Sequence, residues 1–512
     1  MKVSAMQSLN ASLILDRAAD RWPQSEYLIG SGQRMTFAES QAAASRVADG
    51  LAGLGVGSGD RVAFQIPNSP VFGLLQYAIW RLGAVPVPLH PAAPPPEVTR
   101  LLQACQPVAL AGLAANAKAL AQAMAPVPAC QHLLLAGSEQ VAGGHSIEGL
   151  MEAEGDAVEP AIRGPEDLGS LLYTSGTTGM PKGVPLGLST IWYQTEFMAD
   201  RFWQLEPSDV VLMIAPGSHL FGQTLLATAA WSGARLVMLP RFDPMALLQA
   251  LQEERVTFFA GVPTLAQFLM TAPMVGSFDL SSLRRVMFGG APMTTAEMQA
   301  FADRFDVEVI TGYGMTEGVP VSYFSADMMA EAPRDSVGRI TQGTEVRIVN
   351  ESGEIAAADE VGEIWVRGPQ MVRQYFESPE ETAVAFADGW YHTGDLGQVD
   401  EAGYLFLHGR ISDLIKRKGY AVYPVEVETI LLAMPGVAEV AVVGVPDETV
   451  GQEIKATIVP RQGAELTAQA VEAFARENLA AYKVPRIIEF RESLPKNYSG
   501  KVMRSELIVA AG

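Results

Sequence analysis

Short apolar runs alternate along the chain with longer stretches of helical periodicity. Residues 61–66, 210–214 and 235–239 are apolar runs of the length of a buried strand. Residues 245–254 are amphipathic with the period of a helix, and residues 72–80 are apolar almost throughout, which predicts one surface helix and one buried helix. Strands that alternate with helices in this way favour an α/β fold with largely parallel sheets.

The pattern changes after about residue 335. Segments 345–349 and 363–366 are β-rich, with a Ser-Gly turn between them, which predicts a small barrel or antiparallel sheet. From residue 409 onward the pattern is that of a compact α+β unit. Its expected elements are helices at 425–434 and 468–479 and strands at 437–443 and 454–459. We therefore expect an N-terminal domain at 1–409 and a C-terminal domain at 410–512, the second of ordinary domain size.

Proline is dense between residues 86 and 96, where the sequence reads PVPLHPAAPPP. We expect this segment to be a loop between two helical segments, because proline lacks the backbone N–H that strands and helix interiors use.

Length and charge exclude several classes of protein. A chain of 512 residues is too long for one hydrophobic core, and its net charge of −21 opposes binding to a nucleic acid backbone. Cys105 and Cys130 are too few for a disulfide framework and lack the spacing of a metal site. No stretch is apolar enough to span a membrane or to serve as a signal peptide, so we expect a cytoplasmic protein.

The segment 173–184, YTSGTTGMPKGV, is the strongest candidate for chemistry. Glycines allow a tight turn whose N–H groups approach an anion, hydroxyl groups add donors, and lysine adds a charge suited to phosphate. A flexible surface turn is the alternative, and a P-loop is disfavoured because Gly183 rather than Ser or Thr follows Lys182. The predicted phosphate-binding residues are Thr174, Ser175, Gly176, Thr177, Thr178, Gly179 and Lys182.

This segment resembles the phosphate-binding loop of the adenylate-forming superfamily, which includes acyl-CoA synthetases, amino-acid adenylation domains and beetle luciferases. Further motifs that resemble those of the family follow in the expected order along essentially the whole chain. The resemblance implies a large N-terminal domain of two α/β sheets plus a small β-barrel, and a small, mobile α+β C-terminal domain. It also implies ATP and Mg²⁺ as cofactors.

The second motif is TGYGMTE at 311–317. Resemblance implies that Tyr313 stacks on adenine, that Thr316 contacts the α-phosphate, and that Glu317 binds Mg²⁺ together with Thr174. Carboxylate oxygen is a ligand that this hard cation prefers. By itself the motif would be a turn with a solvated acid. Further residues that the resemblance places at the nucleotide are Gly290, Ala291, Gly312, Gly314 and Met315.

Two further motifs, WYHTGD and PKNYSGK, resemble the family's ribose-binding segment and its catalytic-lysine loop. Resemblance implies that Asp395, in WYHTGD, accepts the ribose hydroxyls with help from Arg410; a turn or helix cap is the alternative role for this aspartate. Lys501, after the glycine of PKNYSGK, is implied to touch the carboxylate and the α-phosphate during adenylation only. Without the motif it would be an ordinary solvated lysine.

The family alternates two orientations of the C-terminal domain around one active site. The segment 409–420 resembles the hinge and thiol-tunnel region, in which Lys418 and Gly419 would lie beside the entering pantetheine arm. The hinge position, Asp or Lys in most of the family, is Ser412 here, and the adjacent Asp413 is a possible substitute.

The acyl pocket is expected around His219, which the resemblance places at the mouth of the acyl tunnel as a positioning group. A core or surface histidine is the alternative. The segment 218–226 has no acidic residue to pair with a substrate ammonium, so an α-amino acid is disfavoured. A fatty or other hydrophobic acid fits best, with an aryl acid second. The other expected pocket residues are Phe221, Gly222, Gly289 and Val319.

The acceptor thiol is expected to be that of coenzyme A. Carrier-protein-loading relatives have an insertion before the ribose aspartate, and residues 336–395 show no obvious one. A stand-alone acyl-AMP ligase that loads the phosphopantetheine of an acyl carrier protein is the alternative. Luciferase-type oxygenation and a non-catalytic nucleotide-binding regulator are more distant ones.

Overall fold

A computed structural model describes residues 8–137, 141–154, 157–174, 181–291, 293–328, 332–333, 335–447, 449–461, 463–496 and 502–508. The chain forms two compact units. The first unit contains Met1–Glu345 and Val366–Tyr391, and the second contains Val346–Trp365 and His392–Gly512. The second unit thus takes a segment from before residue 410, and the expected boundary between residues 409 and 410 stays a prediction.

The larger sheet of the first unit has the order β16-β15-β14-β13-β12-β10-β11-β1-β2. The six strands from β14 to β1 are parallel, and β2, β15 and β16 are antiparallel to their neighbours. The bounds are β1 Glu26–Gly30, β2 Gln33–Thr36, β10 Val210–Met213, β11 Arg235–Met238, β12 Phe258–Gly261, β13 Arg285–Phe288, β14 Glu308–Met315, β15 Gly318–Phe324 and β16 Ser336–Ile340. The strands predicted from the runs at 210–214 and 235–239 are confirmed as β10 and β11.

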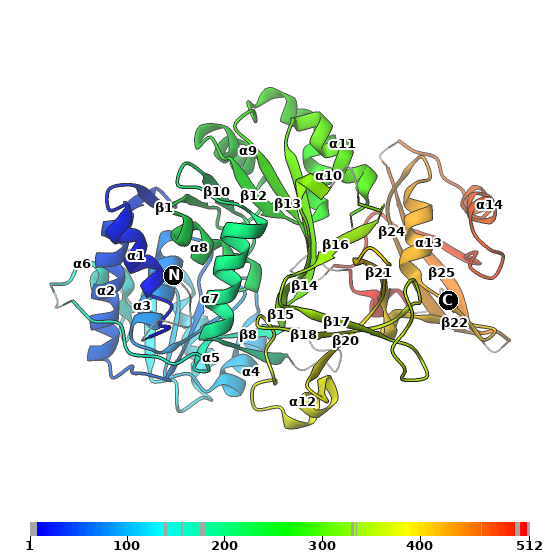
Figure 1. Ribbon diagram of the computed structural model, residues 1–512. Coiled ribbons are helices and arrows are strands. Elements are labelled where there is room, and N and C mark those ends of the chain that lie inside the picture. Colours follow the sequence, from blue (N-terminus) through cyan, green and yellow to red (C-terminus); the bar gives the residue numbers. More distant parts are fainter. Residues whose placement is uncertain are drawn as a thin grey trace. The chain divides into compact units, whose positions relative to one another are not determined.

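Helices α9, α10 and α11 cover one face of this sheet (Figure 1). Their bounds are α9 Pro244–Glu253, α10 Pro263–Thr271 and α11 Thr295–Phe305. Each contributes its apolar stripe, for example Leu247 and Leu251 of α9 and Phe301 of α11, to a cluster that also contains Phe259 and Phe288 of the strands. The amphipathic pattern at 245–254 thus predicted α9 to within one residue at each end.

The smaller sheet of the first unit is all parallel, in the order β4-β3-β5-β6-β7. Its bounds are β3 Arg61–Gln65, β4 Val85–Pro88, β5 Ala109–Leu113, β6 His132–Ala136 and β7 His145–Ser146, and a separate hairpin consists of β8 Leu168–Thr174 and β9 Lys182–Gly187. Helices α4 Pro95–Cys105 and α5 Ala117–Met124 pack on this sheet through one apolar cluster. The remaining helices of the first unit are α1 Leu13–Arg21, α2 Phe37–Gly53, α3 Pro70–Arg81, α6 Ile147–Glu152, α7 Leu188–Glu196, α8 Leu220–Ser232 and α12 Pro379–Ala385. Every residue of α3 is buried, as the apolar run at 72–80 predicted.

The proline-dense segment is the expected loop only at residues 89–94. Val85–Pro88 forms strand β4, and Pro95 and Pro96 begin helix α4. Both placements follow from the missing N–H of proline. Strand β4 lies at the edge of its sheet, where no further strand needs the N–H, and the first turn of a helix does not use its N–H groups.

The second unit contains two groups of strands. The first has the order β17-β18-β20-β21. Among the described residues, β17 and β21 do not pair with each other, so the expected small barrel is not closed. The second has the order β23-β22-β25-β24, with β26 beside β25. The bounds are β17 Glu345–Val349, β18 Gly362–Arg367, β20 Trp390–Val399, β21 Tyr404–Arg410, β22 Ile415–Arg417, β23 Tyr420–Val422, β24 Val437–Asp447, β25 Gly451–Pro460 and β26 Ile487–Phe490. The first residue of β17, the last two of β18 and the first two of β20 belong to the first unit.

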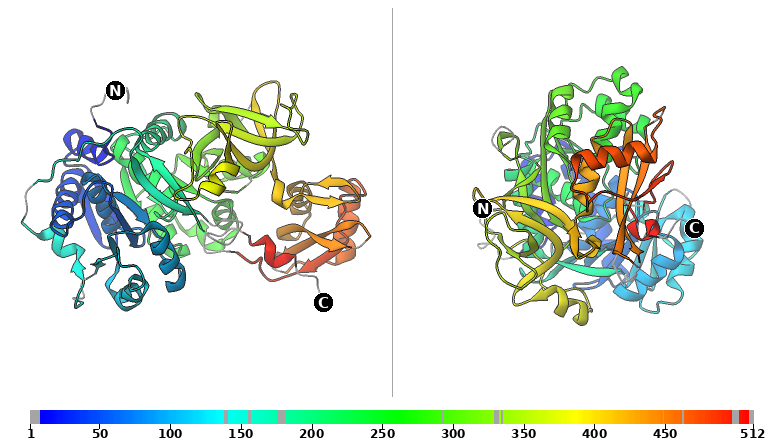
Figure 2. Two further views of the ribbon diagram at one scale, coloured as in Figure 1. Left: turned by 90° about the horizontal axis from the view of Figure 1, so that it is seen from below. Right: turned by 90° about the vertical axis from the view of Figure 1, so that its right-hand side faces the viewer.

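Helices α13 Pro424–Leu432 and α14 Ala468–Asn478 pack against the second of these sheets, in the orange and red part of Figure 2. Both were predicted from the sequence, and so were β24 and β25. Strand β24 extends four residues beyond the predicted end at 443, because its pairing with β25 continues to Asp447↔Gly451. The mixed α/β architecture and the α+β C-terminal part are confirmed.

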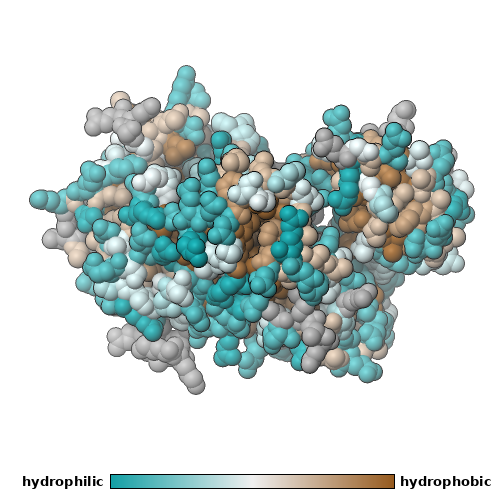
Figure 3. Space-filling model, turned by 90° about the horizontal axis from the view of Figure 1, so that it is seen from above, coloured by the Kyte–Doolittle hydropathy of each residue, from teal (hydrophilic) through white to brown (hydrophobic). Residues whose placement is uncertain are grey.

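Hydrophilic and hydrophobic residues are interspersed on the face that Figure 3 shows. Within the part of the chain that the structure describes, no helix has both the length and the apolar character needed to cross a membrane.

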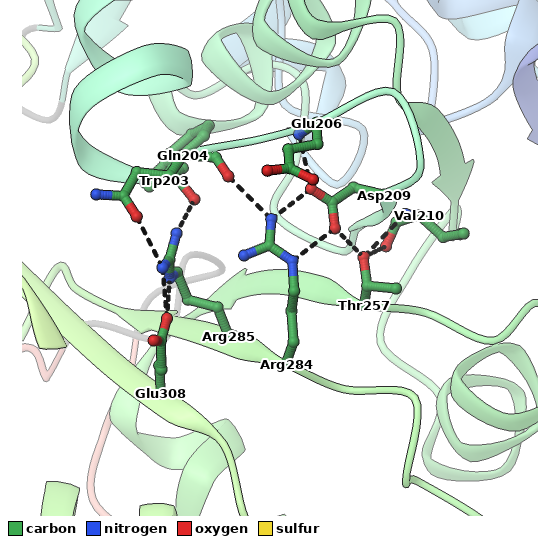
Figure 4. Close-up of polar contacts among 9 residues, drawn as sticks. All are labelled: Trp203, Gln204, Glu206, Asp209, Val210, Thr257, Arg284, Arg285 and Glu308. Atoms are coloured by element: carbon green, nitrogen blue, oxygen red, sulfur yellow. Dashed lines mark hydrogen bonds and ion pairs between the residues drawn. The ribbon is translucent and has the colours of Figure 1, made fainter.

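A network of ion pairs holds the amino ends of β10, β12, β13 and β14 together (Figure 4). Asp209 lies just before β10 and accepts hydrogen bonds from Arg284 Nε at 2.8 Å and from Thr257 Oγ1 at 2.6 Å. Arg285 bonds Glu308 and the carbonyl oxygen of Trp203. The network fixes the edge of the sheet opposite to the carboxyl ends of its strands.

Candidate active site

The strand order of the larger sheet predicts where a ligand binds. The chain runs from β10 outward to β11 and then crosses back to β12 on the other side of β10. Ligands of open parallel sheets bind at the carboxyl ends of the strands, beside the point where the direction of winding changes. That point lies between β10 and β12. His219 follows β10, and the Gly289–Ala291 segment follows the neighbouring β13.

Thr174 and Lys182 stand opposite each other at the ends of β8 and β9, where they are register partners. Both side chains are half-buried. The hairpin therefore presents one hydroxyl group and one ammonium group at the two ends of the predicted phosphate loop. Five predicted phosphate-binding residues of that loop lie outside the described residues, namely Ser175, Gly176, Thr177, Thr178 and Gly179.

Thr316 and Glu317 form the two-residue turn of the β14–β15 hairpin, between the paired residues Met315 and Gly318. The hairpin explains the glycines on either side of Tyr313. A Cβ at Gly312 would lie 2.7 Å from the carbonyl oxygen of Ser322, and one at Gly314 would lie 2.6 Å from Val319 Cγ2. The sequence thus folds into a tight hairpin that carries Thr316 and Glu317 at the carboxyl end of β14.

Two tyrosines surround Glu317, and sequence analysis assigned neither of them a role. Tyr375 Oη donates a hydrogen bond of 2.8 Å to Glu317 Oε1, and Tyr391 Oη lies 3.4 Å from Tyr375 Oη. The same Tyr375 ring lies 5.0 Å below the ammonium group of Lys182. Tyr375 is 58 residues from Glu317 in sequence, and no periodicity or spacing in the sequence indicates that the two meet.

The donor set around Glu317 fits a magnesium ion that arrives with nucleotide. The described residues contain no group of three or more His, Cys, Asp or Glu side chains that could hold a metal by themselves. Mg²⁺ commonly binds through one or two carboxylates together with substrate phosphates. Glu317, only 8% exposed, supplies such a carboxylate within a polar surround.

His219 immediately precedes helix α8 at the winding-change point. Burial lowers its pKa. Its ring meets that of His90 edge to face at 5.8 Å, and burial, followed by the electrostatic interaction with His219, lowers the pKa of His90 to about 4. Among the described atoms, Nε2 of His219 is buried without a hydrogen-bond partner. The loop before it is fixed by Asn68, whose Oδ1 accepts from Gly217 N at 2.8 Å.

The other expected acyl-pocket residues lie in the first turn of α8, directly after β13 and in β15. Phe221 packs edge to face on Trp203 at 5.8 Å. Gly222 is required by close packing, since a Cβ there would lie 2.3 Å from the carbonyl oxygen of Pro216. Gly289 follows β13, and Val319 lies in β15 beside the end of β14. Gly290 and Ala291, which were expected at the nucleotide, come directly after Gly289. Gly290 has φ +78, and a Cβ at this position would lie 3.7 Å from Val262 Cγ1.

Asp395 and Arg410, predicted from two separate motifs, are partners in the second unit. They are register neighbours on β20 and β21, and Arg410 Nε lies 3.2 Å from Asp395 Oδ1. Thr393 fixes the turn before the aspartate, since its Oγ1 donates to the carbonyl oxygen of Ile364 at 2.7 Å and accepts from Asp395 N at 3.0 Å. The arrangement presents a carboxylate beside a guanidinium group.

The expected hinge and thiol-tunnel residues follow Arg410 in the sequence of the second unit. Ser412 is exposed and donates to Asp413 Oδ1 at 3.1 Å. Lys418 and Gly419 form the two-residue turn between β22 and β23, with φ +52 and φ +81. A turn with two positive φ values favours glycine, so the backbone supplies a reason for Gly419 in addition to the expected thiol passage.

Lys501 lies outside the described residues, and the two ends of its loop are described. Lys496 and Val502 form an isolated antiparallel bridge, and Met503 N donates to the carbonyl oxygen of Pro495 at 2.8 Å. Beyond the loop, the Arg504 guanidinium bonds Glu428 Oε2 at 3.0 Å. The base of the lysine loop is therefore anchored to helix α13.

Comparisons with known proteins agree with this geometry. The family model "AMP-binding enzyme" matches residues 15–376, and "AMP-binding enzyme C-terminal domain" matches residues 426–501. The long-chain-fatty-acid–CoA ligase FadD13 of Mycobacterium tuberculosis is 35% identical, over 93% of this chain and 92% of its own length. A feruloyl-CoA synthase of Amycolatopsis sp is 35% identical, over 96% and 97%. The crystal structure of the anthranilate CoA ligase AuaEII with anthranoyl-AMP has a TM-score of 0.93 at 28% identity, over 99% and 98%.

Both family models match in the order that the motifs predicted, and the matched relatives are covered almost completely. The chain belongs to the AMP-binding enzyme family and is an ATP-dependent ligase that activates a carboxylic acid as an acyl-adenylate and passes the acyl group to a thiol.

Proposed function

We propose that the acid is hydrophobic, that the thiol is coenzyme A, and that the predicted site residues perform the roles that the motifs imply. The observation that carries the proposal is the uncharged character of helix α8, Leu220–Ser232, which begins at the expected acyl pocket. Its threonine hydroxyl groups are used internally: Thr224 donates to the carbonyl oxygen of Leu220 at 2.8 Å, and Thr228 to that of Thr224 at 2.7 Å. Such a helix favours an apolar acyl chain over a substrate that carries an ammonium group.

In the first half-reaction, a carboxylate oxygen of the acid attacks the α-phosphorus of ATP. A bond between that oxygen and phosphorus forms, and the bond to the pyrophosphate leaving group breaks. Two anions meet in this step, so charge neutralisation and positioning supply most of the catalysis. We assign Lys182 and the loop 174–179 to the phosphates, Thr316 and Lys501 to the α-phosphate, and Glu317 with Thr174 to Mg²⁺, which neutralises phosphate charge when bound.

Tyr313, Asp395 and Arg410 are assigned to the nucleoside. The Tyr313 ring would stack on adenine, and the Asp395 carboxylate, oriented by Arg410 at 3.2 Å, would accept the ribose hydroxyls. His219 is assigned to the acid. As a neutral imidazole it donates one hydrogen bond to the carboxylate without protonating it, which leaves the nucleophile charged.

In the second half-reaction, the thiolate sulfur attacks the carbonyl carbon of the acyl-adenylate, and AMP leaves. The relatives named as CoA ligases support coenzyme A as the acceptor. Two observations support a hydrophobic acid: one relative is named for a long-chain fatty acid, and helix α8 has no charged residue.

Pyrophosphate exchange with a panel of acids tests this proposal. We expect the fastest exchange with straight-chain fatty acids, slower exchange with aryl acids, and none above background with α-amino acids. The loaded enzyme is then mixed with coenzyme A or with a phosphopantetheinylated acyl carrier protein, and discharge of the adenylate is followed. Discharge by the carrier protein alone, or preference for an amino acid, would contradict the proposal.

The assignment of Ser412 as the hinge leads to a separate prediction. Ser412→Pro is expected to leave adenylation within about twofold and to slow thioester formation by about 10-fold, equal to about 1.4 kcal/mol of barrier. Proline restricts φ at the proposed pivot and so hinders the reorientation of the C-terminal domain that only the second half-reaction needs. Single-turnover measurement of each half-reaction, with Ser412→Ala as the control, checks this. Equal losses in both half-reactions would show that residue 412 is not the pivot.

A further inference from the structure

Glu317 is held by a side chain that none of the motifs contains. Its Oε1 accepts the 2.8 Å hydrogen bond from Tyr375, and the carboxylate is almost fully buried. A hydrogen bond to an ionised acceptor is shorter and about twice as strong as one between neutral groups. The Tyr375 hydroxyl group therefore restricts the orientation of the carboxylate.

Tyr375 itself is fixed in place by its own segment of backbone. Val372 N donates to the carbonyl oxygen of Glu317 at 2.8 Å, and Phe376 N donates to that of Gly183 at 2.8 Å. Tyr375 N donates to Thr382 Oγ1 at 3.0 Å. Residues 372–376 thus connect the β14–β15 hairpin to strand β9, and Tyr375 lies between the two hydrogen-bonded ends of this segment.

The hydroxyl group of Tyr391 lies beside that of Tyr375 and helps to hold it in place. Tyr391 Oη lies 3.4 Å from Tyr375 Oη, and Phe386 packs against both rings at 5.5 and 4.9 Å between centroids. The Tyr391 hydroxyl group and the Phe386 ring together restrict the position of Tyr375.

The face of the Tyr375 ring performs a different task from its hydroxyl group. The Lys182 ammonium lies 5.0 Å from the ring centroid, within the range of a cation–π contact. A single side chain therefore contacts the anion predicted to hold the metal and the cation predicted to hold the phosphates.

We propose that Tyr375 is a positioning residue for the magnesium–nucleotide complex: its hydroxyl group orients Glu317 toward the metal, and its ring orients Lys182 toward the phosphates. This inference rests on the proposed roles of Glu317 and Lys182. Carboxylates that bind metals are commonly oriented by such hydrogen bonds, whose loss weakens metal binding by about 10- to 100-fold.

Tyr375→Phe separates the two tasks, because it removes the hydroxyl group and keeps the ring. We expect the Mg²⁺ concentration for half-maximal pyrophosphate exchange to rise about 10-fold, with little change in the KM for ATP at saturating Mg²⁺. Mn²⁺ binding to the enzyme–nucleotide complex, measured by electron paramagnetic resonance, should weaken by a similar factor. Tyr375→Leu removes the ring as well, and should also raise the KM for ATP at saturating Mg²⁺.

Tyr193→Phe is the matched control, since its hydroxyl group donates a comparable 3.0 Å hydrogen bond to the carbonyl oxygen of Gln342. We expect it to leave the Mg²⁺ dependence unchanged. Thermal melting of each variant separates a loss of folding from a loss of metal binding.

Glu317→Gln distinguishes failure of this inference from failure of the proposed function. If Glu317→Gln weakens Mn²⁺ binding and Tyr375→Phe does not, the positioning role is wrong and the metal assignment stands. If Glu317→Gln leaves Mn²⁺ binding intact, the metal assignment is wrong and the positioning role falls with it. Equal effects of Tyr375→Phe and Tyr193→Phe would also overturn the inference.

Discussion

Replacement of Lys501 by alanine is expected to reduce acid-dependent pyrophosphate exchange by about 100-fold or more. In the first half-reaction a carboxylate and a phosphate are forced together, and the lysine ammonium is the proposed group that offsets both charges at the reacting atoms. The proposed mechanism does not use this lysine in the second half-reaction, so the variant should still consume a pre-made acyl-adenylate in the presence of coenzyme A. Rapid-quench measurement of each half-reaction separately checks the expectation.

Lys496→Ala is the appropriate control for this variant. Lys496 stands at the base of the same loop and pairs with Glu439 at 2.5 Å, so its removal perturbs the loop and leaves Lys501 present. We expect this control to lose less than about twofold in either half-reaction, in keeping with the small contribution of a partly exposed ion pair. Undiminished adenylation by Lys501→Ala would refute the catalytic role of the lysine.

The largest expected effect on stability comes from Asp209→Ala. Asp209 has a side-chain exposure of only 3% and pairs with Arg284, whose exposure is 36%. Its removal leaves the guanidinium and Thr257 without their shared acceptor at the amino edge of the sheet (Figure 4). We expect a loss of about 2–3 kcal/mol in the free energy of unfolding, measured by urea denaturation.

The pH dependence of this loss has a defined sign. Burial tends to raise the pKa of Asp209, but hydrogen bonds from Arg284, Thr257 and Glu206 N, together with the charge of Arg284, outweigh burial and lower the pKa below 3.8. A group whose pKa is lower in the folded state stabilises the fold above its unfolded pKa, about 3.9. The stability gap between wild type and Asp209→Asn should therefore be constant at neutral pH and shrink as the pH falls below about 4.

Glu345→Ala provides the comparison for Asp209→Ala. Glu345 pairs with Arg367 through Oε2 at 2.7 Å, but both side chains are about half exposed, at 58% and 48%. An exposed pair contributes little to stability because solvent screens it, so we expect a much smaller loss than for Asp209→Ala. If the two alanine variants lose equal stability, the amino-edge network does not have the role assigned to it.

Local patterns in the sequence predicted several of the elements and several of the candidate residues. The apolar runs predicted β10 and β11, and periodicity predicted α9 and the helices α13 and α14. Gly312 and Gly314 around Tyr313 were predicted from the resemblance of their motif to that of the family, and the structure adds that the close packing of the hairpin leaves no room for a side chain there. These features depend on neighbours a few residues away, which the sequence displays directly.

The strand and helix within the proline-dense segment could not be predicted from the local sequence. Strand β4 tolerates its prolines only because it lies at the edge of a sheet, and edge position is a property of strand order. The same holds for the position of His219 at the change of winding, which depends on the chain crossing back from β11 past β10 to β12.

The sequence by itself therefore determined the family, the order of the motifs and the α/β character of this protein, since each depends on residue types at short spacing. Only the tertiary structure decided that Tyr375 supports Glu317 and faces Lys182, and that Asp209 holds the opposite edge of the sheet. The physical reason is that these contacts join residues from separate strands and loops, and packing rather than sequence distance brings such residues together.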